Sequence, residues 1–434
     1  MKATRYVRIA ELADHVGETV ELRGWLYNKR SSGKISFLLV RDGTGVVQGV
    51  LVRADVDPET WAAYDSLTQE SSLIATGTVR EDARAPGGFE LSLRTVEPVQ
   101  IASEYPIGPK EHGSGFLLDN RHVWLRSSRP WHVLRVRDTV IRAIRVFLHE
   151  RGFLLLDTPI LTRAVGEEAG TLFETEYFDL GKASLAQTGQ LYVEAGAMAF
   201  GRVYCFGPTF RAEKSKTRRH LTEFWMVEPE MAWFDWEDSM DLQEDLIVGV
   251  VERVLAERRA DLEALERDVA RLEAVKEPFP RLSYDDAVEH LREKGSATEW
   301  GQDFGGEDQT LLTETSDRPV FVHSFPKKAK AFYMKEHPER SDVVLSNDLF
   351  APEGYGEIIG GSQREDDHDR LLARIREEDL PEEAYAWYLD LRRYGSVPHS
   401  GFGLGVERTV AWICGLAHLR EAIPFPRLIN RLEP

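Results

Sequence analysis

The residues best suited to chemistry begin with an arginine-rich stretch at 210–224. It reads FRAEKSKTRRHLTEF, so Arg211 and Glu213 precede a cationic loop that ends before Phe224. We expect two antiparallel strands joined by this loop, an arrangement that places charged side chains on one face of a sheet. Arginine binds phosphate oxygens through two parallel hydrogen bonds, and an aromatic ring stacks on a purine. The stretch is therefore typical of a polyphosphate-binding hairpin, with a solvated surface hairpin as the alternative.

A second candidate is the glycine-rich stretch at 398–408, which reads PHSGFGLGVER. Gly401, Gly403 and Gly405 alternate, so one face of a strand here would carry no side chains and a ligand could lie flat against it. Arg408 then opens a helix. A dinucleotide-binding fingerprint requires a strand before its glycines, whereas a helix and a proline loop precede these. We expect a ligand-binding strand, and a plain glycine-rich turn is the alternative.

A third candidate consists of Asp348 and Glu357, followed by a run that ends at Arg364. Two carboxylates near a nucleotide suit Mg²⁺, a hard ion that takes oxygen ligands and bridges phosphates. Two unrelated surface acids are the alternative. Arg364 comes seven residues after Glu357, so the two share a strand face only if Gly360-Gly361 carries a bulge.

The composition is that of an acidic globular protein. The 434 residues include 54 Lys+Arg and 73 Asp+Glu, which gives a net charge of −19. This excludes a protein that coats nucleic acid by bulk electrostatic attraction, but it leaves room for a local basic patch. A hydrophobic fraction of 42% over this length predicts two or three domains with buried cores.

The sequence also predicts where the protein works. Cys205 and Cys414 are the only cysteines, and neither lies in a zinc-ligand spacing, so we expect no disulfide and no zinc. The N-terminal residues lack the apolar stretch of a signal peptide, and no segment approaches 18 consecutive apolar residues. We expect a cytoplasmic protein that does not associate with membranes.

The first hundred residues read as a small barrel. Five runs are rich in β-branched and apolar residues: 19–27, 35–40, 46–52, 73–79 and 88–96. Five short strands in this length favour an OB-fold, which we assign to residues 1–103. A stretch dense in Pro and Gly follows, and it predicts a linker over 104–122.

Residues 123–434 read as a second domain that mixes helices and strands. Apolar residues at helical spacing predict a helix over 131–151, and strand-like runs alternate with glycine-rich loops from 153 to 230. We expect a helical insertion over about 236–315, then strands at 319–325, 343–349 and 356–359 and helices at 381–394 and 407–415. Without βαβ alternation, this order predicts an α+β domain.

In chain order, the three candidate motifs resemble the signature motifs of class II aminoacyl-tRNA synthetases. The whole chain is similar to the subgroup that charges aspartate, asparagine and lysine. The run LLDNRHVWLR at 117–126 and a first motif ending at Thr158-Pro159 add to the resemblance. The resemblance implies an N-terminal OB-fold that binds a tRNA anticodon and a catalytic domain built on an antiparallel sheet. It also implies a homodimer, ATP as a substrate and Mg²⁺ as a cofactor.

The implied reaction has two steps. The amino-acid carboxylate attacks the α-phosphate of ATP and releases pyrophosphate, and the terminal ribose of a tRNA then takes the aminoacyl group and releases AMP. The implied ATP-binding residues are Arg211, Glu213, Arg219, His220, Phe224, Glu357 and Arg408, with Arg211 and Arg408 as the catalytic residues. Asp348 and Glu357 would hold the metal ion.

The implied amino-acid pocket contains Glu167, Gln190, Arg211, Glu223 and Arg364. Aspartate enzymes of this subgroup have a lysine that pairs with the substrate side chain, and Val193 stands at that position here. A buried aspartate carboxylate would then be poorly compensated. An amide instead needs one donor and one acceptor, which Arg364 and Glu223 would supply, and Glu223 would also repel a carboxylate.

Asparagine is therefore the favoured substrate and tRNA(Asn) the favoured partner. The runs at 330–334, 362–365 and 423–427 also look like those of asparagine enzymes. An aspartate enzyme, strict or relaxed, is the alternative. A paralogue that makes free asparagine through an aspartyl adenylate is another, which the N-terminal barrel disfavours.

The barrel contains a candidate site for tRNA. Arg30 and its basic neighbours surround Phe37, and cations beside an exposed aromatic ring suit a single-stranded loop. A phenylalanine in the barrel core is the alternative. The resemblance implies that Arg30, Phe37 and Gln48 hold the central anticodon uridine, which asparagine and aspartate anticodons share.

Overall fold

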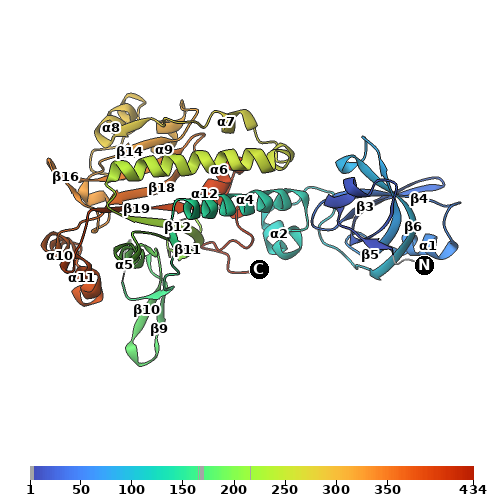
Figure 1. Ribbon diagram of the computed structural model, residues 1–434, viewed down its shortest axis with the longest axis horizontal. Coiled ribbons are helices and arrows are strands. Elements are labelled where there is room, and N and C mark those ends of the chain that lie inside the picture. The colour runs from blue at the N-terminus through green and yellow to red at the C-terminus, as the bar shows by residue number, and fades with distance from the viewer. Residues whose placement is uncertain (1–3, 165, 167–170, 216) are drawn as a thin grey trace. The chain divides into compact units, whose positions relative to one another are not determined.

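The chain folds as two units, Met1–Ser114 and Gly115–Pro434, in the computed structural model shown in Figure 1. The structure describes residues 4–164, 166, 171–215 and 217–434. Among these residues, no helix is both long enough and apolar enough to cross a membrane. Each unit is built around its own hydrophobic core.

The N-terminal unit is a closed β-barrel. Its strands are β1 (Arg5–Tyr6), β2 (Thr19–Ser32), β3 (Ile35–Arg41), β4 (Val46–Val52), β5 (Ser72–Glu81) and β6 (Phe89–Gln100), connected by η1 (Ile9–His15), α1 (Pro58–Ser66) and η2 (Pro86–Gly88). The strand order is β1-β2-β3-β4-β6-β5, and a pairing between β2 and β5 closes the sheet. This confirms the predicted all-β barrel.

The alternation of side chains in β3 decides what the barrel shows to solvent. Leu38 and Val40 are buried in the core, whereas Phe37 and Leu39 point to the outer face. The helix α1 was not predicted, although Asp57 and Pro58 are typical of a helix start. The Asp57 side chain accepts a hydrogen bond from the Thr60 N–H at 2.7 Å.

The second unit is built on an eight-stranded sheet in the order β13-β14-β17-β18-β19-β12-β11-β7. These strands are β7 (Leu154–Leu155), β11 (Arg202–Phe210), β12 (Glu223–Ala232), β13 (Arg281–Ser283), β14 (Val320–His323), β17 (Ser346–Ala351), β18 (Gly356–Gln363) and β19 (His399–Gly405). Only the two outermost pairings, β13 with β14 and β7 with β11, are parallel. This confirms the predicted α+β domain on an antiparallel sheet.

Three helices cover one face of this sheet: α4 (Ser128–Glu150), α6 (Trp236–Ala264) and α12 (Val406–Cys414). Figure 1 shows α4 and α6 running side by side. The apolar face predicted for the first helix is buried, with Val140 and Ile144 fully enclosed. Gly152, at φ 78°, follows the end of α4 in the left-handed conformation that stops a helix.

The remaining elements surround the edges of the sheet. The helices are α2 (Ser114–Asp119), α3 (Arg121–Trp124), α5 (Gln190–Phe200), α7 (Val269–Glu273), α8 (Tyr284–Glu293), α9 (Gly306–Thr313), α10 (His368–Glu377) and α11 (Ala386–Arg393), with short 3₁₀ turns η4 (Phe178–Leu180), η5 (Lys327–Ala329), η6 (Glu382–Tyr385) and η7 (Leu419–Glu421). Two small sheets contain β8 (Leu161–Thr162), β9 (Glu174–Glu176) and β10 (Lys182–Leu185), and β15 (Glu336–His337) and β16 (Arg340–Val344).

Two segments differ from the sequence expectation. The expected linker over 104–122 contains α2 and the start of α3. The expected helical insertion over about 236–315 contains α6 to α9, but it also contributes β13 to the edge of the central sheet. A strand of three residues is too short to show a periodicity of its own, and its parallel pairing with β14 is a tertiary contact.

A bulge in β18 sets which side chains share a face. Leu349 pairs with Ile359 and Phe350 pairs with Glu357, so Ile358 has no partner in β17. The bulge therefore lies at Ile358 and not at the two glycines where the sequence suggested it. It has the expected consequence, because the extra residue turns Glu357 and Arg364 to the same side of the sheet.

Replacing Gly77 by alanine is expected to destabilise the barrel by about 1–3 kcal/mol, the usual range for overpacking. A Cβ at Gly77 in β5 would lie 2.6 Å from the Ser92 carbonyl oxygen of β6, which the strand pairing holds in place. Thermal unfolding followed by circular dichroism measures the effect. Gly108→Ala is the matched control, because a Cβ there has no heavy atom within 4 Å. Equal midpoints for the two variants would contradict the prediction.

Candidate active site

A cavity of about 970 Å³ lies against the uncovered part of the central sheet. The seven expected ATP-binding side chains all line it: Arg211, Glu213, Arg219, His220, Phe224, Glu357 and Arg408. They come from the β11–β12 hairpin, from β18 and from α12. The structure therefore brings together the three motifs that are far apart in the sequence.

The β11–β12 hairpin presents alternate residues to the cavity. Phe224 and Met226 of β12 line it, whereas the next residue, Val227, is buried in the core on the other face of the sheet. The Arg211 guanidinium lies 5.4 Å from the centre of the Phe224 ring. Both side chains are thus held together at one wall of the cavity.

His220 and Glu213 face each other across the loop of this hairpin, 3.3 Å apart. Burial lowers the pKa of His220 below its ordinary value, and the nearby arginines lower it further, although Glu213 opposes them. The imidazole is therefore held as a neutral ring, which can accept or donate one hydrogen bond.

Arg219 joins the hairpin loop to the far wall of the cavity. Its guanidinium donates to the Gly306 carbonyl at 3.1 Å, to the Thr310 hydroxyl at 3.0 Å and to the Gly354 carbonyl. Gly306 and Thr310 belong to α9, which also lines the cavity. The sequence did not predict this wall, because α9 carries no motif and reaches the site only through the tertiary fold.

The glycines of β19 form the floor of the cavity. A Cβ at Gly403 would collide with the Met226 side chain, and Gly403 and Gly405 both line the cavity. Arg408 follows in the first turn of α12, and its guanidinium donates to the Glu357 carbonyl oxygen at 2.8 Å. The flat floor and the arginine at its end fit the expectation for a ligand that lies against the sheet.

Asp348 and Glu357 converge on the bare face of another glycine. A Cβ at Gly360 would lie 3.0 Å from Glu357 Oε1 and 3.6 Å from Asp348 Oδ1. Lys330 donates to the other Asp348 oxygen at 2.6 Å. Burial alone would lower the pKa of Lys330, but Asp348 and neighbouring carboxylates raise it above its ordinary value. Glu357 lines the cavity, and Asp348 lies buried behind it.

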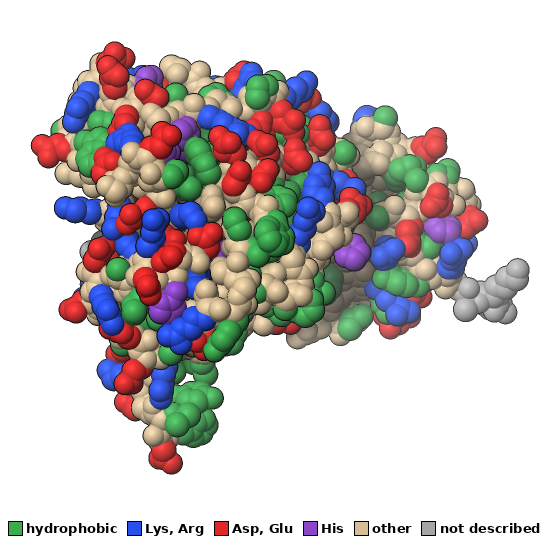
Figure 2. Space-filling model, turned by 60° about the vertical axis from the view of Figure 1, so that its left-hand side comes forward, with side chains coloured by type: hydrophobic (Ala, Val, Ile, Leu, Met, Phe, Trp, Pro, Cys, Tyr) green, Lys and Arg blue, Asp and Glu red, His purple; other side chains and the backbone are tan. Residues whose placement is uncertain are grey.

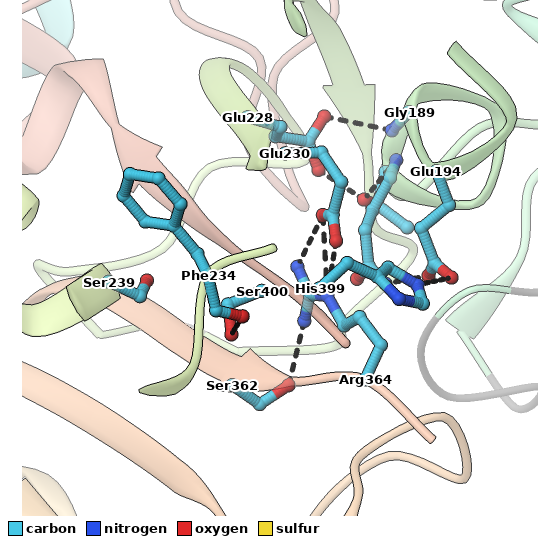
Figure 3. Close-up of polar contacts among 12 residues, drawn as sticks. Gly189, Glu194, Glu228, Glu230, Phe234, Ser239, Ser362, Arg364, His399 and Ser400 are labelled. Atoms are coloured by element: carbon cyan, nitrogen blue, oxygen red, sulfur yellow. Dashed lines mark hydrogen bonds and ion pairs between the residues drawn. The ribbon is translucent and has the colours of Figure 1, made fainter. Parts of the chain in front are cut away.

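Arg364 is buried in an ion pair with Glu230 of β12. Its Nη2 lies 2.9 Å from Glu230 Oε2 and its Nε lies 3.1 Å from Oε1, while Nη1 donates to the Ser362 hydroxyl at 2.7 Å. Figure 3 shows the Glu230 carboxylate directed at this guanidinium. Burial alone would lower the pKa of Arg364, but Glu230 raises it. The guanidinium is therefore ionised, and it is held in place through Nε, Nη1 and Nη2.

Gln190 lies in a second buried cluster next to this pair. Its Nε2 donates to Glu194 Oε1 at 2.8 Å, one turn further along α5. Glu194 also contacts Arg392 of α11 and His399 of β19, at 2.7 and 3.0 Å. Sequence reasoning missed Glu194, Glu230 and Arg392. The spacing of four between Gln190 and Glu194 was a signal on one helix face, but the partners on α11 and β19 are tertiary.

Three other positions that the sequence analysis assigned to the amino-acid pocket are Glu223, Val193 and Glu167. Glu223 begins β12, forms a bridge with Arg427 and points away from the face that carries Phe224, so the structure does not bring it to Arg364. The carboxylates of β12 on the cavity face are instead Glu228 and Glu230. Val193 is fully buried in an apolar cluster. Glu167 lies outside the described residues.

The predicted tRNA-binding residues form one group on the outside of the barrel. The Arg30 guanidinium lies 4.5 Å from the centre of the Phe37 ring and 3.4 Å from Gln48 Oε1. Phe37 is only half-buried and is not part of the barrel core. The outward direction of Phe37 excludes the alternative of a core phenylalanine.

Arg364→Met is expected to lower the free energy of unfolding by about 3–5 kcal/mol, because it leaves the buried carboxyl group of Glu230 without its ion-pair partner. Unfolding in guanidinium chloride measures the loss. Arg376→Met is the control, since it breaks an ion pair with Glu382 that is exposed at the surface and should change stability far less. An equal loss in the two variants would refute the interpretation of the buried pair.

Comparison with known families and structures covers both units. Residues 114–429 match the family described as tRNA synthetases class II (D, K and N), and residues 20–99 match the OB-fold nucleic acid binding domain. Asparagine–tRNA ligase from Desulforamulus reducens is 58% identical over 98% of this chain and 99% of its own. The enzyme of the same name from Symbiobacterium thermophilum is 57% identical over 99% and 100%.

Solved structures agree over the full length. Asparaginyl-tRNA synthetase from Pyrococcus horikoshii, complexed with asparaginyl-adenylate, has a TM-score of 0.96 and 47% identity, covering 99% of this chain and 100% of its own. The synthetase from Entamoeba histolytica, in complex with the same adenylate, has a TM-score of 0.91 and 31% identity over both whole chains. The chain, with its OB-fold and its antiparallel catalytic sheet, therefore belongs to the class II aminoacyl-tRNA synthetases of the aspartate, lysine and asparagine group.

Proposed function

We propose that the chain is an asparagine–tRNA ligase, which activates L-asparagine with ATP and transfers it to the 3′ end of tRNA(Asn). The observation that carries the proposal is the identity of 58% over nearly the whole length to a relative of that name. The buried Val193, at the position of the aspartate enzymes' lysine, supports an uncharged substrate side chain.

In the proposed site, ATP occupies the large cavity with its adenine against Phe224. Arg211 and Arg408 are the catalytic residues, and they neutralise phosphate charge as it shifts during the attack. Glu213 reads the adenine amino group, and Arg408 covers the other face of the ring. Arg219 contacts the terminal phosphates, as does His220. The three arginines that line this cavity, Arg211, Arg219 and Arg408, support the assignment.

Asp348 and Glu357 fit a magnesium ion, since their oxygens converge where Gly360 carries no side chain. When bound there, Mg²⁺ would neutralise phosphate charge and help to orient the triphosphate. Lys330 donates a hydrogen bond to the second oxygen of Asp348 and so keeps this carboxyl group directed at the site, although burial raises the pKa of Asp348 to about 8. A larger residue at position 360 would fill the same space.

The chain need not supply a general base for the activation step. An amino-acid carboxylate is already ionised at neutral pH, so it can attack the α-phosphate directly. The protein contributes position and charge, and Arg211 reaches both the carboxylate and the phosphate in this proposal. Gln190 and Arg364 bind the amino acid, and we keep Glu167 as a partner of its ammonium group.

The barrel supplies the proposed anticodon site. Phe37 offers its outer face to a base, Arg30 supplies charge, and Gln48 supplies an amide that can pair with a base edge. Gln48 also donates to Glu90 at 3.3 Å, which fixes the orientation of its amide. This combination suits a single-stranded loop more than a duplex.

A homodimer is part of the proposal because apolar side chains are exposed at two places, on the edge strand of the catalytic sheet and on the β9–β10 hairpin. Leu154 and Leu155 of the edge strand β7 are 45% and 40% exposed, and Phe178 and Leu180 between β9 and β10 are 87% and 65% exposed. Figure 2 shows hydrophobic side chains gathered at the end of the β9–β10 hairpin, at the lower edge. An edge strand with apolar neighbours is suited to pairing with a second copy.

ATP–pyrophosphate exchange with asparagine and aspartate, compared side by side on the purified protein, tests the function. We expect exchange with asparagine and at most weak exchange with aspartate, because the pocket lacks the lysine that would balance a carboxylate. Arg408→Ala is expected to abolish exchange, while Arg393→Ala, an arginine on the surface of α11, should leave it intact. Exchange with aspartate alone would refute the proposal.

Phe37→Ala is expected to lower kcat/KM for tRNA by roughly 10- to 100-fold, the loss that follows from removing one stacked base. Aminoacylation at varied tRNA concentration measures the effect, and pyrophosphate exchange should stay at the wild-type rate. Val99→Ala, an exposed apolar residue of β6, is the matched control. A kcat/KM for tRNA equal to that of the control variant would exclude Phe37 from the anticodon site.

A further inference from the structure

Glu194 is a completely buried carboxylate with four hydrogen-bond partners. It accepts from Gln190 at 2.8 Å, from the Tyr388 hydroxyl at 2.5 Å and from Arg392 at 2.7 Å, and His399 Nε2 lies 3.0 Å away. Burial alone would raise the pKa of Glu194, but Arg392 and His399 lower it below its ordinary value. The group is therefore ionised, and none of the expected functions uses its charge.

This carboxylate lies between the two residues proposed to bind the amino acid. It contacts Gln190 directly, and one oxygen each of Glu194 and Glu230 and a ring nitrogen of His399 lie within 4.8 Å of one another. Glu230 in turn holds Arg364. Figure 3 shows Glu194 beside the His399 ring, next to the Glu230–Arg364 pair. Because both carboxylates are paired with guanidinium groups, we interpret the cluster as a charge-balanced network.

Among the residues that the structure describes, the network has no surplus of positive charge. It contains the carboxylates Glu194 and Glu230, the guanidiniums of Arg364 and Arg392, and the imidazole of His399. The carboxylate of Glu228 joins it through Thr188, whose hydroxyl donates to Glu228 and accepts from the Gln190 N–H. The formal charges sum to zero if the imidazole carries two protons and to −1 if it carries one. A neutral substrate side chain leaves this balance unchanged, whereas a carboxylate adds a charge that nothing in the network compensates.

We propose that Glu194 is a specificity-determining residue, whose buried charge makes the pocket reject an amino acid with a carboxylate side chain. This inference rests on the proposed function, since it concerns the choice between asparagine and aspartate at the same site. Glu194 acts through the network and not by direct contact. It keeps the positive charge of Arg392 occupied, so that this guanidinium cannot compensate a substrate carboxylate.

Glu194→Gln tests the proposal, because it removes the charge and keeps the size of the side chain. The glutamine amide can still accept from Gln190 and Tyr388, and it can donate to Nε2 of a neutral His399. We expect the ratio of kcat/KM for asparagine to kcat/KM for aspartate, measured by pyrophosphate exchange, to fall by roughly 10- to 100-fold. The fall should come from a gain in aspartate activation.

Glu244→Gln is the matched control. Glu244 is a buried glutamate of α6 that accepts from the Phe279 N–H at 2.7 Å, on the helix-covered face of the sheet. The substitution removes the same charge at a place outside the network around Glu194. For Glu244→Gln, the ratio of kcat/KM for asparagine to kcat/KM for aspartate is expected to equal that of the wild type. The midpoints of thermal unfolding of both variants report whether the fold is retained.

Arg392→Gln supplies a second and opposite test. It leaves the Glu194 charge without its guanidinium partner, so the network becomes more negative and aspartate should be rejected more strongly. The double variant Glu194→Gln/Arg392→Gln should return the ratio toward the wild-type value. A purely structural role predicts losses of the same sign in both single variants, so the opposite signs separate the two explanations.

A failure of the inference about Glu194 can be told apart from a failure of the proposed function. If the wild type uses asparagine and folded Glu194→Gln still rejects aspartate as the wild type does, the inference is overturned and the function stands. If Glu194→Gln does not fold, the test rests on Arg392→Gln: a rise in the ratio of kcat/KM for asparagine to kcat/KM for aspartate supports the inference, and a fall overturns it. If the wild type shows no exchange with asparagine, the proposed function fails together with the inference that rests on it.

Discussion

The alternating glycines of β19 leave one face of this strand without side chains, and the rest of the site depends on this bare surface. At one end, Gly403 and Gly405 make the floor of the large cavity. At the other end, a Cβ at Gly401 would collide with Glu230 and lie 2.6 Å from Arg364. The same strand therefore makes room for the nucleotide and for the buried ion pair.

Charge is arranged differently at the two ends of this surface. The wall beside Phe224 carries Arg211, Arg219 and Arg408 toward the cavity, which suits a polyanion. The buried network around Glu194 has each guanidinium paired with a carboxylate. An excess of positive charge binds phosphate, and a balanced network accepts a neutral group more readily than a charged one.

Much of the architecture could be read from the sequence, because it depends on local patterns. The alternation in the barrel strands and the apolar face of α4 predicted the elements that the structure contains. The three motifs predicted which side chains line the cavity, and they do so because each motif lies within one strand, hairpin or helix start. Helix α1 also begins with a local signal, since Asp57 caps it and Pro58 occupies its first turn.

The remaining features depended on tertiary structure. The side of β12 to which Glu223 points follows from strand register, and the bulge at Ile358 that aligns Glu357 with Arg364 follows from pairing with β17. Glu194 is an ordinary acidic residue on a helix until α11 and β19 place Arg392 and His399 beside it. The sequence by itself determined the family, the two-part architecture and the residues around the nucleotide, since these are encoded in short contiguous motifs. Only the tertiary structure decided which buried charges neutralise one another, because electrostatic energy depends on distance and burial and not on position along the chain.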